Sequence, residues 1–353
     1  MTAGTASPST WWVRGHGWWG PVLGLLLVAS AGFALAHGQA GIEPSGVVSV
    51  LASKVGLVDV APHDRQALVD QAIIWDVRLP RVLLSVLVGA GLGVVGVVMQ
   101  TLTRNQLADP YLLGISSGAS LGAVLVVVAG LGAGQASLAS GAFVGACVVL
   151  VMVLVLGSSH GQLRPSRTIL AGVAIGQLCS ALLALVIIWV SRPEATQGIQ
   201  FWLAGSLAGG TWPAVAATAA ALALTLAWCL ASTRALDALA FGETSAAALG
   251  VHVRSLRWSM LVTTALLTAV LVSVSGSIGF VGLILPHAVR FFTGPGHRRL
   301  LPAAALAAAV FLLWADTAAR TLFAPRELPV GVVTALVGVP AFVLLLYRTD
   351  EAP

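Results

Sequence analysis

The chain has 353 residues, of which 58% are hydrophobic and 9% are charged, and its formal net charge is +5. An ordinary soluble domain carries about 25% charged residues, so the composition excludes that class. A transmembrane β-barrel needs short strands of alternating polarity, and the long unbroken apolar runs exclude that class too. The composition therefore predicts an all-α, polytopic membrane protein.

Charged residues are separated by gaps that match the thickness of a lipid bilayer. A helix rises about 1.5 Å per residue, so roughly 20 apolar residues cross a hydrocarbon core of about 30 Å. The uncharged stretch 258–289 is too long for one crossing, and Ser275-Gly276-Ser277 is its predicted break. In chain order we predict ten membrane-spanning helices, at 18–36, 82–103, 112–129, 136–157, 168–190, 212–232, 258–274, 277–290, 300–317 and 330–347.

The first apolar stretch has two interpretations. It is either the first membrane helix or a removable signal peptide that ends at Ala34-Leu35-Ala36. Both interpretations fit a polar N-terminal segment that is followed by an apolar run.

The orientation follows from the arginines, because basic residues accumulate on the cytoplasmic side of a membrane. Ten crossings with the N-terminus inside place most arginines inside and most acidic residues outside. Basic residues do not cluster on a soluble face, so we expect no nucleic-acid partner. The sequence predicts a single transmembrane domain, 1–353, with cytoplasmic tails at 1–17 and 348–353, an external segment at 37–81 and a cytoplasmic segment at 233–257.

Two strings imitate enzyme motifs. Gly91-Leu92-Gly93-Val94-Val95-Gly96 matches a dinucleotide fingerprint, but it lies inside a predicted span, where glycines let helices approach closely. Gly114-Ile115-Ser116-Ser117-Gly118 matches the nucleophile elbow of serine hydrolases, but no histidine stands in an obvious position to act as its base. We therefore expect packing or path-lining roles, with an intramembrane protease as the alternative.

The chain offers no obvious energy source of its own. Lys54 is the only lysine, and no Walker loop surrounds it, so nucleotide-driven activity would come from another polypeptide. Ion-coupled carriers usually hold ionisable groups inside their spans, and here only Asp316 is expected in one, with Arg320 as its partner on the same helix face. That pair could also be purely structural. Asp109 before Pro110 is typical of a helix N-cap.

The three cysteines lie inside apolar spans. We interpret them as small packing residues, because their spacing suggests neither a metal site nor a disulfide framework. They are Cys147, Cys179 and Cys229.

Several strings, in order over residues 75–348, resemble the FecCD (BtuC-like) family of permeases of ABC importers. The resemblance implies a ten-helix permease with the BtuC-like type II importer fold, in the cytoplasmic (inner or plasma) membrane of a prokaryote. The strings are Arg78-Leu79-Pro80-Arg81-Val82, Arg104-Asn105-Gln106-Leu107-Ala108-Asp109-Pro110, Leu113-Gly114-Ile115-Ser116-Ser117-Gly118-Ala119, Gly276-Ser277-Ile278-Gly279-Phe280-Val281-Gly282-Leu283 and Glu327-Leu328-Pro329-Val330-Gly331-Val332-Val333-Thr334-Ala335.

The resemblance also implies partners and a cargo. A second permease subunit, identical or related, would complete the path, and a binding protein would deliver the cargo from outside. Two cytoplasmic ATPases would hold ATP and Mg, so the chain itself binds no cofactor and is not an enzyme. The expected cargo is an iron(III)-siderophore, with haem, cobalamin or another cofactor as alternatives on the same scaffold. An ion-coupled secondary transporter is the alternative class.

Functional residues are implied by matching positions, with no catalytic residue and no metal ligand among them. Arginines for docking the binding protein are Arg78, Arg81 and Arg320, which could instead anchor a span end. Residues for coupling to the ATPase, in a segment that could also be a solvated loop, are Gly242, Glu243, Ala248, Leu249 and Gly250. The cytoplasmic gate would contain Asn105, Leu107, Ala108, Asp109, Pro165 and Ser166. The translocation path would contain Gln100, Ser116, Ser117 and Ser120.

Overall fold

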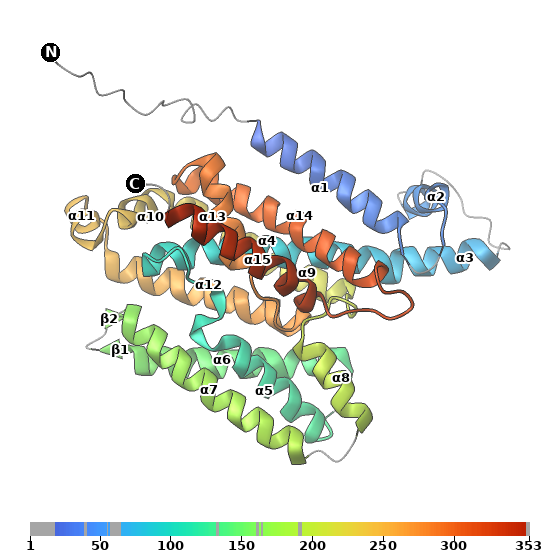
Figure 1. Ribbon diagram of the computed structural model, residues 1–353, viewed down its shortest axis with the longest axis horizontal. Coiled ribbons are helices and arrows are strands. Elements are labelled where there is room, and N and C mark those ends of the chain that lie inside the picture. The colour runs from blue at the N-terminus through green and yellow to red at the C-terminus, as the bar shows by residue number, and fades with distance from the viewer. Residues whose placement is uncertain are drawn as a thin grey trace.

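The computed structural model describes residues 18–38, 41–54, 56, 65–131, 134–159, 162–163, 165–189 and 193–350. The predicted tail 1–17 and the last residues of the predicted tail 348–353 lie outside this part. The described chain is almost entirely helical, as predicted (Figure 1). Its elements are α1 (Trp19–Ala36), α2 (Pro44–Lys54), α3 (Arg65–Ala72), the π-helix η2 (Ile73–Arg78), α4 (Leu79–Thr103), the 3₁₀-helix η3 (Pro110–Leu113), α5 (Ile115–Val128), α6 (Gln135–Gly157), β1 (Ser158–Ser159), β2 (Gln162–Leu163), α7 (Pro165–Trp189), α8 (Pro193–Leu203), α9 (Trp212–Ala231), α10 (Thr233–Ala240), α11 (Glu243–Ala248), α12 (Val253–Ser275), α13 (Val281–Thr293), α14 (His297–Thr321) and α15 (Val330–Asp350).

Each of the ten predicted spans coincides with a helix. Seven helices of the described chain are long and apolar enough to cross a membrane, and α5, α13 and α15 are shorter apolar helices. The predicted break after Ser275 is confirmed, because Gly276 leaves the helix with φ 66° and α13 begins only at Val281. Helix α8 was not predicted; it lies in the connection between α7 and α9.

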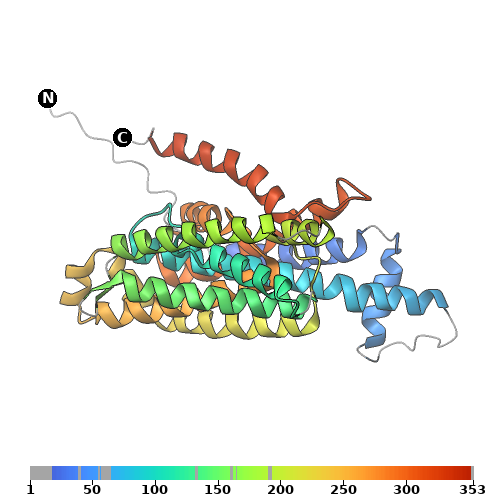
Figure 2. The same cartoon turned by 90° about the horizontal axis from the view of Figure 1, so that it is seen from below.

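Helix α4 is the centre of the bundle and is buried along nearly its whole length. It packs against α14, α13, α12 and α9, while α1 lies at the edge along α14 (Figure 1). Helices α5, α6 and α7 pack on one another and join the core mainly through α12. Figure 2 shows α15 extending away from the bundle.

Glycines of α4 allow this close packing, as the sequence predicted for the string Gly91–Gly96. A Cβ atom at Gly93 would lie 2.5 Å from the carbonyl oxygen of Ala304 in α14. A Cβ at Gly96 would overlap the carbonyl oxygen of Gly282 in α13. Small residues let neighbouring helix backbones approach in this way, so the dinucleotide interpretation is excluded here by structure as well as by context.

The bundle has two distinct ends. We call the end with α10, α11 and the β1–β2 hairpin the α11 end, and the end with α2, α3 and residues 322–329 the α3 end. Figure 1 shows the α11 end on the left and α2 and α3 on the right. The residues predicted to couple to the ATPase lie at the α11 end, and the arginines predicted to dock the binding protein lie at the α3 end.

Candidate functional site

Helix α11 is a short helix that two glycines delimit. Gly242 precedes it with φ 113°, and Gly250 follows Leu249 with φ 82°. L-residues rarely adopt such positive φ values, so glycine is required at both positions. The amide of Val251 donates to the carbonyl of Ala246 at 3.0 Å and closes the helix. The predicted stop at Gly250 is confirmed.

Apolar side chains are exposed on and beside α11, next to its exposed polar residues Glu243, Thr244 and Ser245. Phe241 is 82% exposed and Leu249 is 72% exposed, whereas Leu236 and Leu239 of the preceding α10 are buried and anchor the segment. We call the exposed group the α11 surface; its members are Phe241, Ala247, Ala248 and Leu249. An apolar patch of this kind with a polar rim is typical of a protein-interaction site.

An ion pair attaches α11 to the bundle. Nη2 of Arg257, on α12, donates to Oε1 of Glu243 at 2.8 Å. Nη1 of the same guanidinium donates to the carbonyl of Leu163, in β2, at 3.3 Å. The hydrogen bond from Arg257 holds the pKa of Glu243 below its usual value; burial opposes this shift, and the charges of Arg257 and Arg104 add to it. Arg257 therefore joins α11, α12 and the hairpin.

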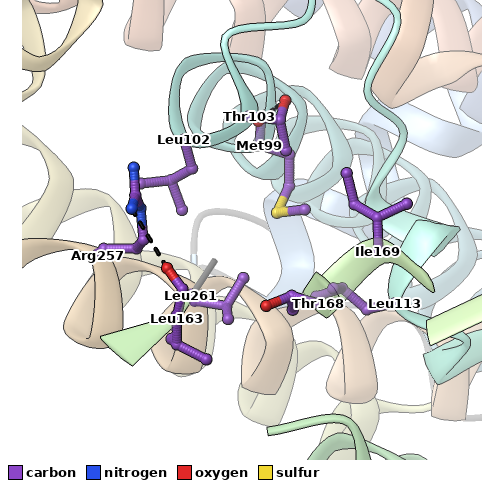
Figure 3. Close-up of a pocket in the computed structure, with 9 residues that line it drawn as sticks. All are labelled: Met99, Leu102, Thr103, Leu113, Leu163, Thr168, Ile169, Arg257 and Leu261. Carbon is purple, nitrogen blue, oxygen red and sulfur yellow. Dashed lines mark hydrogen bonds between the residues drawn. The ribbon is translucent and has the colours of Figure 1, made fainter. Parts of the chain in front are cut away.

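A small apolar cavity of about 20 Å³ lies beside Arg257, between α4, α7 and α12 (Figure 3). Its lining includes Met99, Thr168 and Leu261, and the dashed line in Figure 3 marks the bond from Arg257 to Leu163. A space of this size holds about one water molecule. The cavity is therefore too small to be a cargo site.

The predicted gate residues after α4 form a turn with its own hydrogen bonds. Oδ1 of Asn105 accepts from the amide of Leu107 at 2.9 Å, and Ala108 is fully buried. The carboxylate of Asp109 accepts from the amide of Tyr111 at 2.7 Å, so the predicted N-cap is confirmed. The Tyr111 hydroxyl then donates to the carbonyl of Ile278 at 3.1 Å, which holds η3 against the break between α12 and α13.

The second predicted gate segment begins α7. Ser166 is exposed, and the side chain of Pro165 lies outside the described residues. Nε of Arg167 donates to the carbonyl of Leu156 at 2.9 Å, so the start of α7 is tied to the end of α6. Helix α7 also packs on η3, where a Cβ at Gly172 would clash with the backbone of Leu112. The structure thus connects the two gate segments through η3 and α7.

The predicted path residues do not gather around one cavity. Gln100 is buried, and its Nε2 donates to the carbonyl of Leu283 at 3.0 Å, so it links α4 to α13. Ser117, on α5, accepts from the Ser180 hydroxyl of α7 at 3.4 Å. Ser116 is half-buried and Ser120 is buried. Their role in a path therefore remains a prediction.

The three predicted docking arginines are buried at the α3 end. Arg81 donates to the carboxylate of Asp316 at 2.9 and 3.1 Å and to Glu327 at 3.1 Å. Nη1 of Arg78 donates to the carbonyl of Leu35 at 2.8 Å, and Arg320 donates to the carbonyl of Ala34. We call this group the arginine cluster; it consists of Arg78, Arg81, Asp316, Arg320 and Glu327.

The arginine cluster fastens the last turn of α1 to the end of η2, through Arg78, and to α14, through Arg320. Helix C-termini leave carbonyl groups without intrahelical partners, and here two arginines supply donors to them. Asp316 is completely buried, and its closest partner is Arg81; Arg320, the expected one, lies at 3.9 Å. This arrangement favours the first-membrane-helix interpretation of α1.

A second network, at the α11 end, was not predicted from the sequence; His297 is buried, whereas 41% of the Asp237 side chain is exposed. Nδ1 of His297 lies 2.6 Å from Oδ1 of Asp237 in α10, and Nε2 lies 2.7 Å from the Thr101 hydroxyl in α4. The sequence of contacts from Asp237 through His297 to Thr101 resembles a catalytic triad. However, Thr101 is buried and its hydroxyl donates to the carbonyl of Val97, so this hydroxyl is not placed to act as a nucleophile. The network therefore fixes α10 between α4 and α14.

The remaining chemistry of the described residues is sparse. Among them, no group of three or more His, Cys, Asp or Glu side chains could hold a metal ion. The three cysteines are free thiols. Lys54, at the end of α2, lies 5.4 Å from the ring centroid of Trp75, a cation–π contact.

Seven helices of the described chain that are long enough to cross a membrane, with a short exposed helix at one end of the bundle, define the class of multi-pass membrane proteins. Residues 25–348 match the model of the FecCD transport family, and the chain belongs to that family. The predicted family is confirmed.

The similar proteins include permeases for different cargoes. The chain is 42% identical over 284 residues to the hemin transport system permease protein HmuU of Yersinia pestis, covering 79% of this chain and 84% of HmuU. It is 39% identical over 293 residues to the vitamin B12 import system permease protein BtuC of Citrobacter koseri, covering 82% and 87%. A solved inward-facing structure of a putative metal-chelate type ABC transporter is similar with a TM-score of 0.81 and 32% identity, covering 94% of this chain and all of that one.

These comparisons establish the class but not the cargo. The chain is a multi-pass inner-membrane permease subunit, it is not an enzyme, and ATP hydrolysis belongs to separate subunits. These two relatives are named for hemin and vitamin B12, so iron(III)-siderophore transport remains a prediction.

Proposed function

We propose that this chain forms the path of an importer for a large metal chelate, with an iron(III)-siderophore, haem and cobalamin as the candidate cargoes. The α11 surface is the observation that carries the proposal. An importer subunit without its own ATPase must receive force from a partner. A short exposed helix that carries apolar side chains at both ends and is anchored by buried neighbours is suited to that contact. With the predicted orientation, the α11 end faces the cytoplasm.

The proposed contact places the α11 surface against the ATPase. Phe241 and Leu249 would supply the apolar contact, and Glu243 would orient α11 through Arg257. ATP-driven closure of two ATPases would displace α11 in each of two permease subunits. The gate segments 105–109 and 165–166 would then open or close the path.

The binding protein would dock at the α3 end, which the predicted orientation places outside. Docking through Arg78, Arg81 and Arg320 requires that the last turn of α1 release two of them, because all three are buried. Arg326 is exposed in the loop between α14 and α15 and offers a second candidate at the same end.

A pair of variants separates these docking sites. Arg78→Gln combined with Arg320→Gln should weaken binding-protein affinity at least tenfold if the buried arginines dock, whereas Arg326→Gln should leave it unchanged. The opposite pattern would move the docking site to the exposed loop. Thermal unfolding in detergent shows whether each variant is folded.

Uptake into proteoliposomes tests the proposed function. The chain, its ATPase and its binding protein are reconstituted, and labelled ferric siderophore, hemin and cobalamin are tested in parallel. We expect ATP-dependent uptake of one chelate class that is lost when the ATPase is omitted. Uptake by the chain alone, driven by a proton or sodium gradient, would instead establish an ion-coupled carrier.

A further inference from the structure

Arg257 occupies a position that connects two regions with separate predicted roles. One hydrogen bond reaches Glu243 in α11, and the other reaches the carbonyl of Leu163 in β2. Only 11% of the Arg257 side chain is exposed, whereas 48% of the Glu243 side chain is exposed. Arg257 is therefore the buried member of a link that begins at the surface.

The Leu163 end of the link leads directly to the start of α7. Leu163 pairs with Ser158 across the hairpin and lies two residues before the first residue of α7, Pro165. Arg167, in the first turn of α7, is bonded to the last turn of α6. A displacement of the Leu163 carbonyl would consequently move the hairpin and the predicted gate segment 165–166 together.

The Glu243 end of the link is held from two sides. Arg257 binds it directly, and the charge of Arg104 also stabilises its carboxylate. Arg104 ends α4 in a left-handed conformation, with φ 51°, and is the first residue of the turn that contains the other gate segment. Nη1 of Arg104 lies 3.8 Å from the position that a Cβ atom would take at Gly242, so the positive charge at the end of α4 is close to the start of α11.

The chemistry of the link requires an arginine. A guanidinium presents several donors in a rigid fork, so one group can bind a carboxylate and a carbonyl at once. A lysine at the same place keeps the charge, but its three donors leave from one nitrogen atom on a flexible stem and cannot match two acceptors as the separate guanidinium nitrogens do. The fold does not depend on this link alone, because Leu256 and Met260, in the first two turns of α12, are buried and anchor the helix independently of Arg257.

We propose that Arg257 is a positioning residue that makes α11, the hairpin and the start of α7 move as one unit. It transmits displacement of α11 by the ATPase to the gate segment 165–166. The inference rests on the proposed function of the α11 surface, and it adds the route by which movement leaves that surface.

The ratio of cargo taken up to ATP hydrolysed tests this role. The complete transporter is reconstituted with Arg257→Lys, and the cargo is whichever of hemin, cobalamin or ferric siderophore the wild type transports. We expect ATP hydrolysis within twofold of the wild type and at least tenfold less uptake per ATP. Arg254→Lys is the matched control, because Arg254 is exposed one turn earlier on α12, and its ratio should not change.

A distance measurement tests the link without cargo. Spin labels are placed at Thr244 and Ser166, both exposed, in a chain whose three native cysteines are replaced by alanine. ATP and vanadate should leave this distance unchanged in the otherwise native chain and change it by several ångströms in Arg257→Lys.

The outcomes separate the two proposals. Equal uptake per ATP in wild type and Arg257→Lys, or the same label distances in both, would overturn the transmission role while the importer function stands. Absence of ATP-driven uptake by the wild-type complex would instead refute the proposed function, whatever the label distances show.

Discussion

The two ends of the bundle differ in which side chains they bury and which they expose. At the α3 end, the arginine cluster buries its charges, and Arg81 alone binds two carboxylates. At the α11 end, Phe241 and Leu249 are exposed, and the ion pair of Glu243 is half exposed. Buried, multiply bonded charges hold helices in one arrangement, whereas an exposed apolar surface is available to a partner.

This difference indicates which end depends on its charged side chains for stability and which end offers side chains to a partner. Removing one partner from a buried charge network leaves the other charge without compensation and is strongly unfavourable. Exposed apolar side chains can be replaced at little cost to the fold. Substitutions at the α3 end should therefore reduce stability, and substitutions at the α11 end should reduce function.

Asp316→Ala should have the largest effect on stability. It leaves the buried guanidinium of Arg81 with only Glu327, and we expect a loss of about 3–5 kcal/mol in the free energy of unfolding. Denaturation of the purified chain in mixed detergent micelles measures this loss. Asp76→Ala, at an exposed position of η2, should change stability by less than about 0.5 kcal/mol. Equal effects of the two variants would contradict the role of the cluster.

Gly96→Ala tests the core that joins the two ends. The new methyl group would overlap the carbonyl of Gly282, so α4 and α13 would have to separate, at a cost of about 1–3 kcal/mol. Gly24→Ala, in α1, meets open space and should be neutral or stabilise by up to about 1 kcal/mol, because alanine is the better helix former. The same denaturation assay compares them; a neutral Gly96→Ala would refute the close contact.

Phe241→Ser combined with Leu249→Ser should leave stability nearly unchanged and weaken association with the ATPase at least tenfold. Both side chains are exposed, so the isolated chain loses little packing. Co-purification at graded ATPase concentrations measures the association. Leu322→Ser, which removes an equally exposed leucine at the α3 end, should not alter it. Retained association of the double variant would exclude the α11 surface as the contact.

The smallest expected effect is a pH dependence at α11. Arg257 lowers the pKa of Glu243 from its ordinary value of 4.5, so the ionised form stabilises the folded state. That contribution is present above pH 4.5 and is lost as the pH falls through the lowered pKa. Hydrogen exchange of α11 should accelerate in that acidic range, and Glu243→Gln should abolish the extra acceleration. If hydrogen exchange of α11 had the same pH dependence in the native chain and in Glu243→Gln, the ion pair would not be what holds α11 in place.

The sequence was sufficient for the spans and the stop of α11, because both are local. Apolar length alone predicts a crossing, and Gly250 ends α11 by its own conformation. The burial of Arg81 was not predictable, because its partner Asp316 is 235 residues away. The hydrogen bonds of Arg257 and the exposure of Phe241 were not predicted, for related reasons. Leu163 lies 94 residues from Arg257, and an apolar residue beside Gly242 was the only available signal for Phe241.

Site-specific cross-linking at Leu249 tests most directly whether force enters at the α11 end. A single cysteine at Leu249, in a chain without its native cysteines, should cross-link to the ATPase in membrane vesicles, and the cross-link should block ATP-driven uptake. Without the cross-linker, the thiol of Leu249→Cys should be protected from a membrane-impermeant thiol reagent that is added outside whole cells. Labelling of Leu249→Cys from outside, without a cross-link to the ATPase, would contradict the account.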